Sequence, residues 1–191
     1  MTADFAVDSV LSGIVFDRQH PGQAENSAMK LYLAGPMFTA AEEAHNLRLA
    51  AKLRDHGFAV FCPNESEPSS DKTRTDITPR LIYDVDIEAV ESCNVLICQV
   101  SEDSGTNWEA GYMDCLSRRV EPGHYYGVIG LATDIRLRTP PHPERHGVEN
   151  QTLHINALVI GGLQRSLGVY LDEDSMIERL KEIRREREGG R

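Results

Sequence analysis

The chain has 191 residues, a formal net charge of −10 and a sequence pI near 5.1. That length suits one domain with a core of its own. The acidic balance argues against partners such as nucleic acid or an anionic membrane surface, because both require clustered Lys and Arg. We find no run of about 18 apolar residues and no signal-peptide pattern at the N-terminus, and we expect a cytoplasmic protein.

Residues 1–29 show no clear period, and we interpret them as an arm or peripheral hairpin that precedes a domain at 30–191. In chain order the pattern then predicts a strand at 31–35, a helix at 39–57, a strand at 58–63, a helix at 78–92, a strand at 94–100, a helix that contains Glu109, a strand at 125–132, a short helix at 153–163, a strand at 168–171 and a helix from about Asp174. This alternation predicts an α/β fold with a mostly parallel sheet of about five strands, covered on both faces.

Two polar segments interrupt the pattern. ESEPSSDKTRTD (65–76) is a loop long enough to be functional, and residues 133–152 are interpreted as an excursion from the domain. The excursion contains HPERH, with His142 and His146, but its prolines indicate a loop rather than a metal site. No GxGxxG follows the first strand, and no GxxxxGK[ST] is present. We therefore expect no metal and no cofactor.

The four cysteines form no CxxC pair, and three of them lie in apolar runs, which predicts reduced residues that serve packing. They are Cys62, Cys93, Cys98 and Cys115. Spacing alone leaves a Ser-His-Asp or Cys-His hydrolase open, although the GxSxG motif of a nucleophile elbow is absent.

In a parallel sheet of this kind, ligands bind beyond the carboxyl ends of the strands. The site should therefore be built from the loops that follow the strands and from the helix starts after them. The candidate positions are Gly35 and Pro36, Asn64 and Glu65, Asp103 to Thr106 with Gly105, and Thr133 onward.

The segment DSGTNWEAGYMDCL places Glu109 among apolar neighbours. One interpretation is a capping box, in which Thr106 caps the helix and Glu109 reaches back to the Thr106 amide. A helical wheel instead puts Glu109 in the middle of an arc formed by Trp108, Tyr112, Met113 and Leu116, with Ala110 and Asp114 opposite. A carboxylate on a packing face must lose water or face a cavity, which favours a site.

Asp86 is a second acid in an unexpected position. On the 78–92 helix it falls in the apolar arc that holds Ile82, Ala89 and Val90. A buried Asp can be structural if it caps or hydrogen-bonds a neighbouring loop, but two inward carboxylates on adjacent helices favour chemistry. Asp103 is a third acid near the same edge, and its structural interpretation is an N-cap or turn residue.

Paired carboxylates without a metal or a phosphate loop suit cleavage at an anomeric carbon. One carboxylate attacks or stabilises an oxocarbenium-like centre, and a second acid protonates the leaving group.

The segments LYLAGPMF, DVDIEAVESCNVLICQV, SEDSGTNWEAGY and INALV resemble those of nucleoside 2-deoxyribosyltransferases, and the resemblance runs from about Lys30 to Leu171. It implies a flavodoxin-like doubly wound fold and exchange of free nucleobases on 2'-deoxynucleosides through a covalent deoxyribosyl-enzyme. It further implies that Glu109 is the nucleophile, that Tyr32 lies near it, and that Asp86 and Asp103 lie near the nucleobase and sugar.

By the same resemblance, Asn156 matches an asparagine that a neighbouring subunit donates toward the 5'-hydroxyl, so a dimer-based homo-oligomer with sites completed across subunits is expected.

Two other functions stay open. The first is an N-glycosidase acting on a nucleoside 5'-monophosphate, although AGPMFTA offers one Thr and no positive charge for a phosphate. The second is a non-catalytic sensor of nucleoside derivatives, in which Glu109 only hydrogen-bonds a ribose.

Overall fold

The structure is a computed structural model that describes residues 29–66, 73–135 and 155–189. Every predicted strand and helix is present. The strands are β1 (Lys30–Ala34), β2 (Ala59–Phe61), β3 (Val95–Gln99), β4 (Gly127–Leu131) and β5 (Val169–Tyr170). The helices are α2 (Ala40–Asp55), α3 (Pro79–Glu91), α4 (Ser104–Cys115), α5 (Ala157–Arg165) and α6 (Glu173–Gly189), with a 3-10 turn η1 (Pro63–Glu65) and a π-helical turn η2 (Leu116–Val120).

The five strands form one parallel sheet in the order β2-β1-β3-β4-β5. β1 is the first strand of the sheet. β2 pairs with one side of β1, and the chain then crosses over so that β3 pairs with the other side. This is the strand order of flavodoxin-like doubly wound folds, so the predicted fold class is confirmed. Ligands of such folds bind where the strand order reverses, beyond the carboxyl ends of the strands, which is here between β1 and β3.

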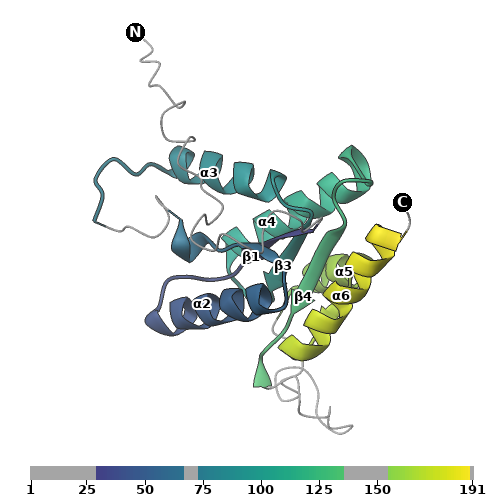
Figure 1. Cartoon of the computed structure of the whole chain (residues 1–191). Helices are drawn as coiled ribbons and strands as arrows, with labels where there is room; N and C mark the ends of the chain where they lie inside the picture. Colours follow the sequence, from purple (N-terminus) through teal and green to yellow (C-terminus); the bar gives the residue numbers. More distant parts are fainter. Residues whose placement is uncertain (1–28, 67–72, 136–154, 190–191) are drawn as a thin grey trace, which may run out of the picture.

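Helices cover both faces of the sheet (Figure 1). Successive side chains along each strand point to opposite faces and pack in two different cores. Leu31 and Leu33 of β1 pack in a core with α2 and α6. Tyr32 and Ala34, which alternate with them, pack in a second core with α3, α4 and α5. The alternation therefore directs Tyr32 toward the layer that carries Glu109.

Local signals in the sequence set the helix ends. The predicted capping box is present at the start of α2, where the Thr39 hydroxyl accepts the Glu42 amide at 3.3 Å and the Glu42 carboxylate accepts the Thr39 amide at 2.8 Å. The Thr78 hydroxyl accepts the Leu81 amide at 3.1 Å and so caps α3. Gly57 has a φ of 78° and ends the α2 segment as predicted.

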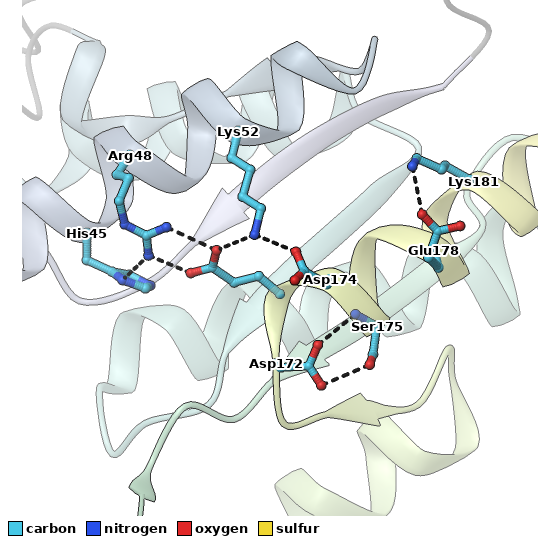
Figure 2. A network of polar contacts seen from close by, with 9 residues as sticks. His45, Arg48, Lys52, Asp172, Asp174, Ser175, Glu178 and Lys181 are labelled. Atoms are coloured by element: carbon cyan, nitrogen blue, oxygen red, sulfur yellow. Dashed lines mark hydrogen bonds and ion pairs between the residues drawn. The ribbon is translucent and has the colours of Figure 1, made fainter.

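Ion pairs join the start of α6 to the C-terminal half of α2 (Figure 2). Glu173 accepts hydrogen bonds from Arg48 and from Lys52, each at 3.0 Å, and Lys52 also donates to Asp174 at 2.7 Å. The Arg48 hydrogen bond lowers the pKa of Glu173 to about 2, so this carboxylate stays charged at neutral pH. These contacts hold α6 on the face of the sheet opposite Tyr32.

Three predicted features lie outside the described residues: the N-terminal arm up to residue 28, positions 67–72 of the polar loop, and the part of the excursion that holds His142 and His146. Within the described ranges, no helix is long and apolar enough to cross a membrane. In the same ranges, no group of three or more His, Cys, Asp or Glu side chains is arranged to hold a metal ion.

Candidate active site

The helix that carries Glu109 begins with Asp103. The Asp103 carboxylate accepts the amide and the hydroxyl of Thr106, both at 2.7 Å, and is the N-cap of α4. Thr106 thus lies inside the first turn and caps nothing, so the capping-box interpretation of Glu109 is wrong. The interpretation of Asp103 as an N-cap is confirmed.

The buried face of α4 is rotated from the predicted one. Met113 and Leu116 are buried as predicted, but Trp108 is 63% exposed and Ala110, which was predicted on the opposite side, is only 7% exposed. Ala110 packs in the core that contains Tyr32. A small side chain lets the helix approach the sheet closely, and this leaves the bulky Trp108 outside the core.

Glu109 is bonded to the sheet and not to its own helix start. The Tyr32 hydroxyl donates a hydrogen bond of 2.7 Å to Oε1 of Glu109. Tyr32 is fully buried, and its ring stacks on Phe61 of β2, with centroids 5.3 Å apart and planes 17° from parallel. Because the ring is held by packing, its hydroxyl fixes the carboxyl group in one place.

Burial raises the pKa of Glu109 from its ordinary value to about 8. The hydrogen bond from Tyr32 opposes this shift, and the charges of Asp86 and Asp103 add to it. Burial also raises the pKa of Tyr32, with further contributions from Glu109 and Asp86. Tyr32 therefore remains a hydrogen-bond donor, while Glu109 changes between acid and carboxylate close to neutral pH. Such shifts are typical of functional sites.

Asp86 reaches the same place from α3. It is half-buried beside the buried residues Val85 and Ala89. Its charge raises the pKa of both Tyr32 and Glu109, so Asp86 lies near the hydrogen bond between them. The structure thus brings together three of the predicted site residues from α3, β1 and α4, at the point where the strand order reverses.

The loop after β1 is tightly built. A Cβ atom on Gly35 would lie 2.1 Å from Nε2 of Gln99, so only glycine lets the Gln99 side chain cross this loop. The Pro36 carbonyl accepts a hydrogen bond of 3.0 Å from Asn46. Both predicted residues therefore lie just beyond the carboxyl end of β1, with Gly35 against Gln99 at the end of β3. Their contact with a substrate stays a prediction.

The start of α4 contributes two further predicted positions. Gly105 is exposed, and a Cβ atom there would lie 3.3 Å from Oδ2 of Asp103. Thr106 is buried, and its hydroxyl hydrogen is used by Asp103. Thr106 therefore holds the helix start in the structure, and its contact with a substrate stays a prediction.

Asn156 is the N-cap of α5. Its Oδ1 accepts the Leu158 amide at 2.9 Å, and its side chain is exposed. Leu158, in the first turn of the same helix, is 84% exposed. Among the described residues, the hydrogen bonds of Asn156 belong to its own helix start and do not link it to Glu109.

The structure also shows a polar residue that the sequence analysis missed. Asn46 of α2 is 3% exposed and bonds to the loops after β1 and β2 and to the end of β3. Its signal was present in the sequence, because Asn46 shares one helix face with the buried residues Leu49, Ala50 and Leu53. A polar side chain on that face is as unexpected as Asp86 on α3.

Three cysteines are buried, as their apolar sequence context predicted, while Cys115 is exposed at the far end of α4. Burial raises the pKa of Cys93 and of Cys98 to about 12 and that of Cys62 to about 11. A thiol needs a lowered pKa to act as a nucleophile near neutral pH. The buried cysteines therefore do not support the Cys-His hydrolase alternative.

The sequence matches the family described as "Nucleoside 2-deoxyribosyltransferase" over residues 31–158, and the chain belongs to that family. This confirms the resemblance found in the sequence. The chain is also 29% identical, over 136 residues, to the uncharacterized protein UU063 of Ureaplasma parvum serovar 3. The match covers 65% of this chain and 80% of the relative.

Two solved structures share the fold. A conserved protein from Enterococcus faecalis V583 has a TM-score of 0.67 at 23% identity, covering 81% of this chain and 98% of its own. The 2-deoxyribosyltransferase from Bacillus psychrosaccharolyticus, described as a biocatalyst for nucleoside synthesis, has a TM-score of 0.51 at 21% identity, covering 78% and 90% of the two chains.

Proposed function

We propose that the protein transfers the 2-deoxyribosyl group between nucleobases of 2'-deoxynucleosides through a covalent ester on Glu109. The observation that carries the proposal is the hydrogen bond between Tyr32 and Glu109. The pKa of the Glu109 carboxyl group is raised, and the group lies where the strand order of the sheet reverses. The chain is also a member of the nucleoside 2-deoxyribosyltransferase family. A protein that only binds nucleosides would not require a buried carboxyl group that a tyrosine hydroxyl holds in one place.

In the first step, an oxygen of the Glu109 carboxylate attacks C1' of the deoxynucleoside from the face opposite the base. The bond between C1' and the base nitrogen breaks, and the base leaves with the electron pair and takes up a proton. Asp103 is committed to Thr106, with both hydrogen bonds at its Oδ2. We assign assistance of the proton transfer to Asp86, whose charge acts on both Tyr32 and Glu109.

The raised pKa of Glu109 fits this chemistry. With a pKa of about 8, about one molecule in ten carries the carboxylate at pH 7. A poorly hydrated carboxylate is more basic and is stabilised by positive charge that develops at C1' in the transition state. Tyr32 keeps one oxygen of the group in place while the other reacts.

In the second step, a nitrogen of the incoming base attacks C1', the ester bond breaks, and the carboxylate is regenerated. The proton on that nitrogen returns to the group that protonated the first base, so the exchange consumes no proton. Two inversions give retained configuration. A 2'-hydroxyl withdraws electrons from the developing cation and needs space beside Glu109, so deoxyribose should react faster than ribose.

The 5'-monophosphate N-glycosidase fits the structure less well. A phosphate in a doubly wound fold is commonly bound by backbone amides where a loop enters a helix. At the start of α2, the amides of Phe38 and Thr39 instead donate to the Glu42 carboxylate, at 2.9 and 2.8 Å. These hydrogen bonds lower the pKa of Glu42 in spite of the nearby negative charge of Asp103. A phosphate there would meet an acidic group already bonded to the donors.

The proposal is tested by incubating the protein with deoxyinosine, with and without free adenine, and separating the products by chromatography. Transfer predicts deoxyadenosine only when adenine is present. Equal loss of deoxyinosine in both samples, without a new nucleoside, would indicate hydrolysis. No turnover of any deoxynucleoside or of its 5'-monophosphate would indicate a sensor.

We further propose a dimer-based homo-oligomer in which Asn156 completes the site of a neighbouring subunit. The exposed side chains of Asn156 and Leu158 at the start of α5 support this. Inactive Glu109→Ala and Asn156→Ala subunits, refolded together in equal amounts, should recover about a quarter of wild-type activity, because about half of the dimers would be mixed and each mixed dimer would contain one intact site of two. Two variants that stay inactive after mixing would contradict a shared site.

A further inference from the structure

Asn46 joins three segments that surround the strand-order reversal. Its Nδ2 donates to the Pro36 carbonyl at 3.0 Å, in the loop after β1, and to Oδ1 of Asn64 at 2.8 Å, in the turn after β2. Its Oδ1 accepts Nε2 of Gln99 at 2.7 Å, at the end of β3. All three bonds belong to one side chain that is 3% exposed.

The Pro36 carbonyl determines which way these amides point. A carbonyl oxygen only accepts hydrogen bonds, so the group of Asn46 that faces it must be the NH2. The second hydrogen of that NH2 then requires the oxygen of Asn64, and the oxygen of Asn46 requires the NH2 of Gln99. Asn64 is thereby held with its own NH2 pointing away from Asn46.

The absence of a side chain at Gly35 leaves space for the Gln99 side chain that Asn46 binds. A side chain on Gly35 would collide with Gln99, at 2.1 Å from Nε2 and 2.7 Å from Cδ. The end of β3 then leads directly to Asp103 and the helix that carries Glu109. A shift of Gln99 would therefore affect both the first loop and the approach to Glu109.

We propose that Asn46 is a positioning residue for the deoxynucleoside site: its buried amide holds the ends of β1, β2 and β3 in one arrangement and fixes the Asn64 side chain with its NH2 facing outward. This inference rests on the proposed function. It concerns a residue of α2 that is not placed among the reacting groups and that acts through the loops it holds.

A merely structural role makes a different prediction, which a matched control can measure. Leu49 lies one turn further along α2 and is fully buried in the core on the same face of the helix. Asn46→Ala and Leu49→Ala should both lower the melting temperature. Under conditions where both variants are folded, as checked by circular dichroism, Asn46→Ala should raise KM about tenfold or more with kcat changed less, whereas Leu49→Ala should leave KM within about twofold.

Asn46→Asp tests the direction of the hydrogen bonds. The carboxylate can still accept from Gln99, but it has no hydrogen for Pro36 or Asn64. Once protonated, the new side chain can donate one hydrogen bond again. KM relative to wild type at the same pH should therefore improve as pH falls for Asn46→Asp and stay constant for Asn46→Ala.

The outcomes separate the two proposals. If wild type transfers the sugar and Asn46→Ala has the same KM as Leu49→Ala, the positioning role is wrong and the proposed function stands. If wild type binds deoxyinosine in a calorimeter without turnover, and Asn46→Ala but not Leu49→Ala weakens that binding about tenfold, the positioning role holds and the transfer is wrong. Wild-type protein that neither binds nor converts deoxynucleosides overturns both.

Discussion

The hydroxyl of Tyr32 in β1 donates a 2.7 Å hydrogen bond to Glu109 in α4, which lies 77 residues further along the chain. The parallel pairing of β1 with β3 makes this contact possible, because α4 directly follows β3. The bond stabilises the carboxylate, while burial and the charge of Asp86 favour the protonated acid. Tyr32 and Asp86 thus have opposite effects on the pKa of Glu109, and a substitution at each residue can measure its effect separately.

The pH dependence of the wild-type enzyme should follow the raised pKa of Glu109. Attack requires the carboxylate, so kcat/KM should increase with pH up to about 8 and level off above it, because this ratio reports the free enzyme. Initial rates of base exchange across this range measure it. An acidic limb at about pH 4 to 5, where an ordinary Glu titrates, would contradict the assignment.

Asp86→Asn should move this acidic limb to lower pH. Removing the negative charge of Asp86 lowers the pKa of Glu109. Turnover should nevertheless fall by roughly 10² if Asp86 assists proton transfer to the base. Glu88→Gln, which changes an exposed acid on the same helix, is the control and should alter neither property. Unchanged kinetics in a folded Asp86→Asn variant would return Asp86 to a structural role.

Tyr32→Phe should move the limb in the opposite direction. The substitution keeps the ring that stacks on Phe61 but removes the donor that lowers the pKa of Glu109. The carboxylate then forms only at higher pH, and activity near neutral pH decreases. The same pH–rate measurement applies. A limb that moves to lower pH, as in Asp86→Asn, would show that Tyr32 does not stabilise the carboxylate.

The raised pKa of Glu109 also predicts a pH-dependent loss of stability. Between about pH 4.5 and 8 the folded protein keeps a proton that the unfolded chain has lost, so the free energy of unfolding should decrease as pH rises through this window. Glu109→Gln removes the titrating group. The gain in stability of Glu109→Gln over wild type should therefore be larger at about pH 9 than at about pH 5, as measured by urea unfolding. A gain that is the same at both values would show that Glu109 titrates normally in the folded protein.

The fold was predictable because each element carries its own local signal. The apolar runs around β1 and β3 and the capping box of Thr39 and Glu42 appear in the structure where the sequence placed them. Asp86 and Glu109 could be identified because acids on an apolar helix face need a reason to be there. The same reasoning would have identified Asn46, had it been applied to polar amides as well as to acids.

Other parts of the site had no local signal. Tyr32 lies in an apolar run and is indistinguishable from a core tyrosine, so only the family resemblance indicated it. The rotation of α4 depends on how closely Ala110 approaches the sheet, which a helical wheel of α4 alone does not contain. For that reason the predicted arc included Trp108, and Thr106 was considered as the N-cap in place of Asp103.

The central claim is that Glu109 forms the covalent bond to the sugar. Wild-type protein incubated with a 2'-fluorinated deoxynucleoside should accumulate the ester, because fluorine disfavours the cation through which the ester breaks down. Mass spectrometry of the digested protein should then find the mass of the fluorinated sugar on the peptide that contains Trp108 and Glu109, and not on that peptide from an inactive Glu109→Ala variant. Base exchange that continues in folded Glu109→Ala, or a sugar attached to a different residue, would contradict the account.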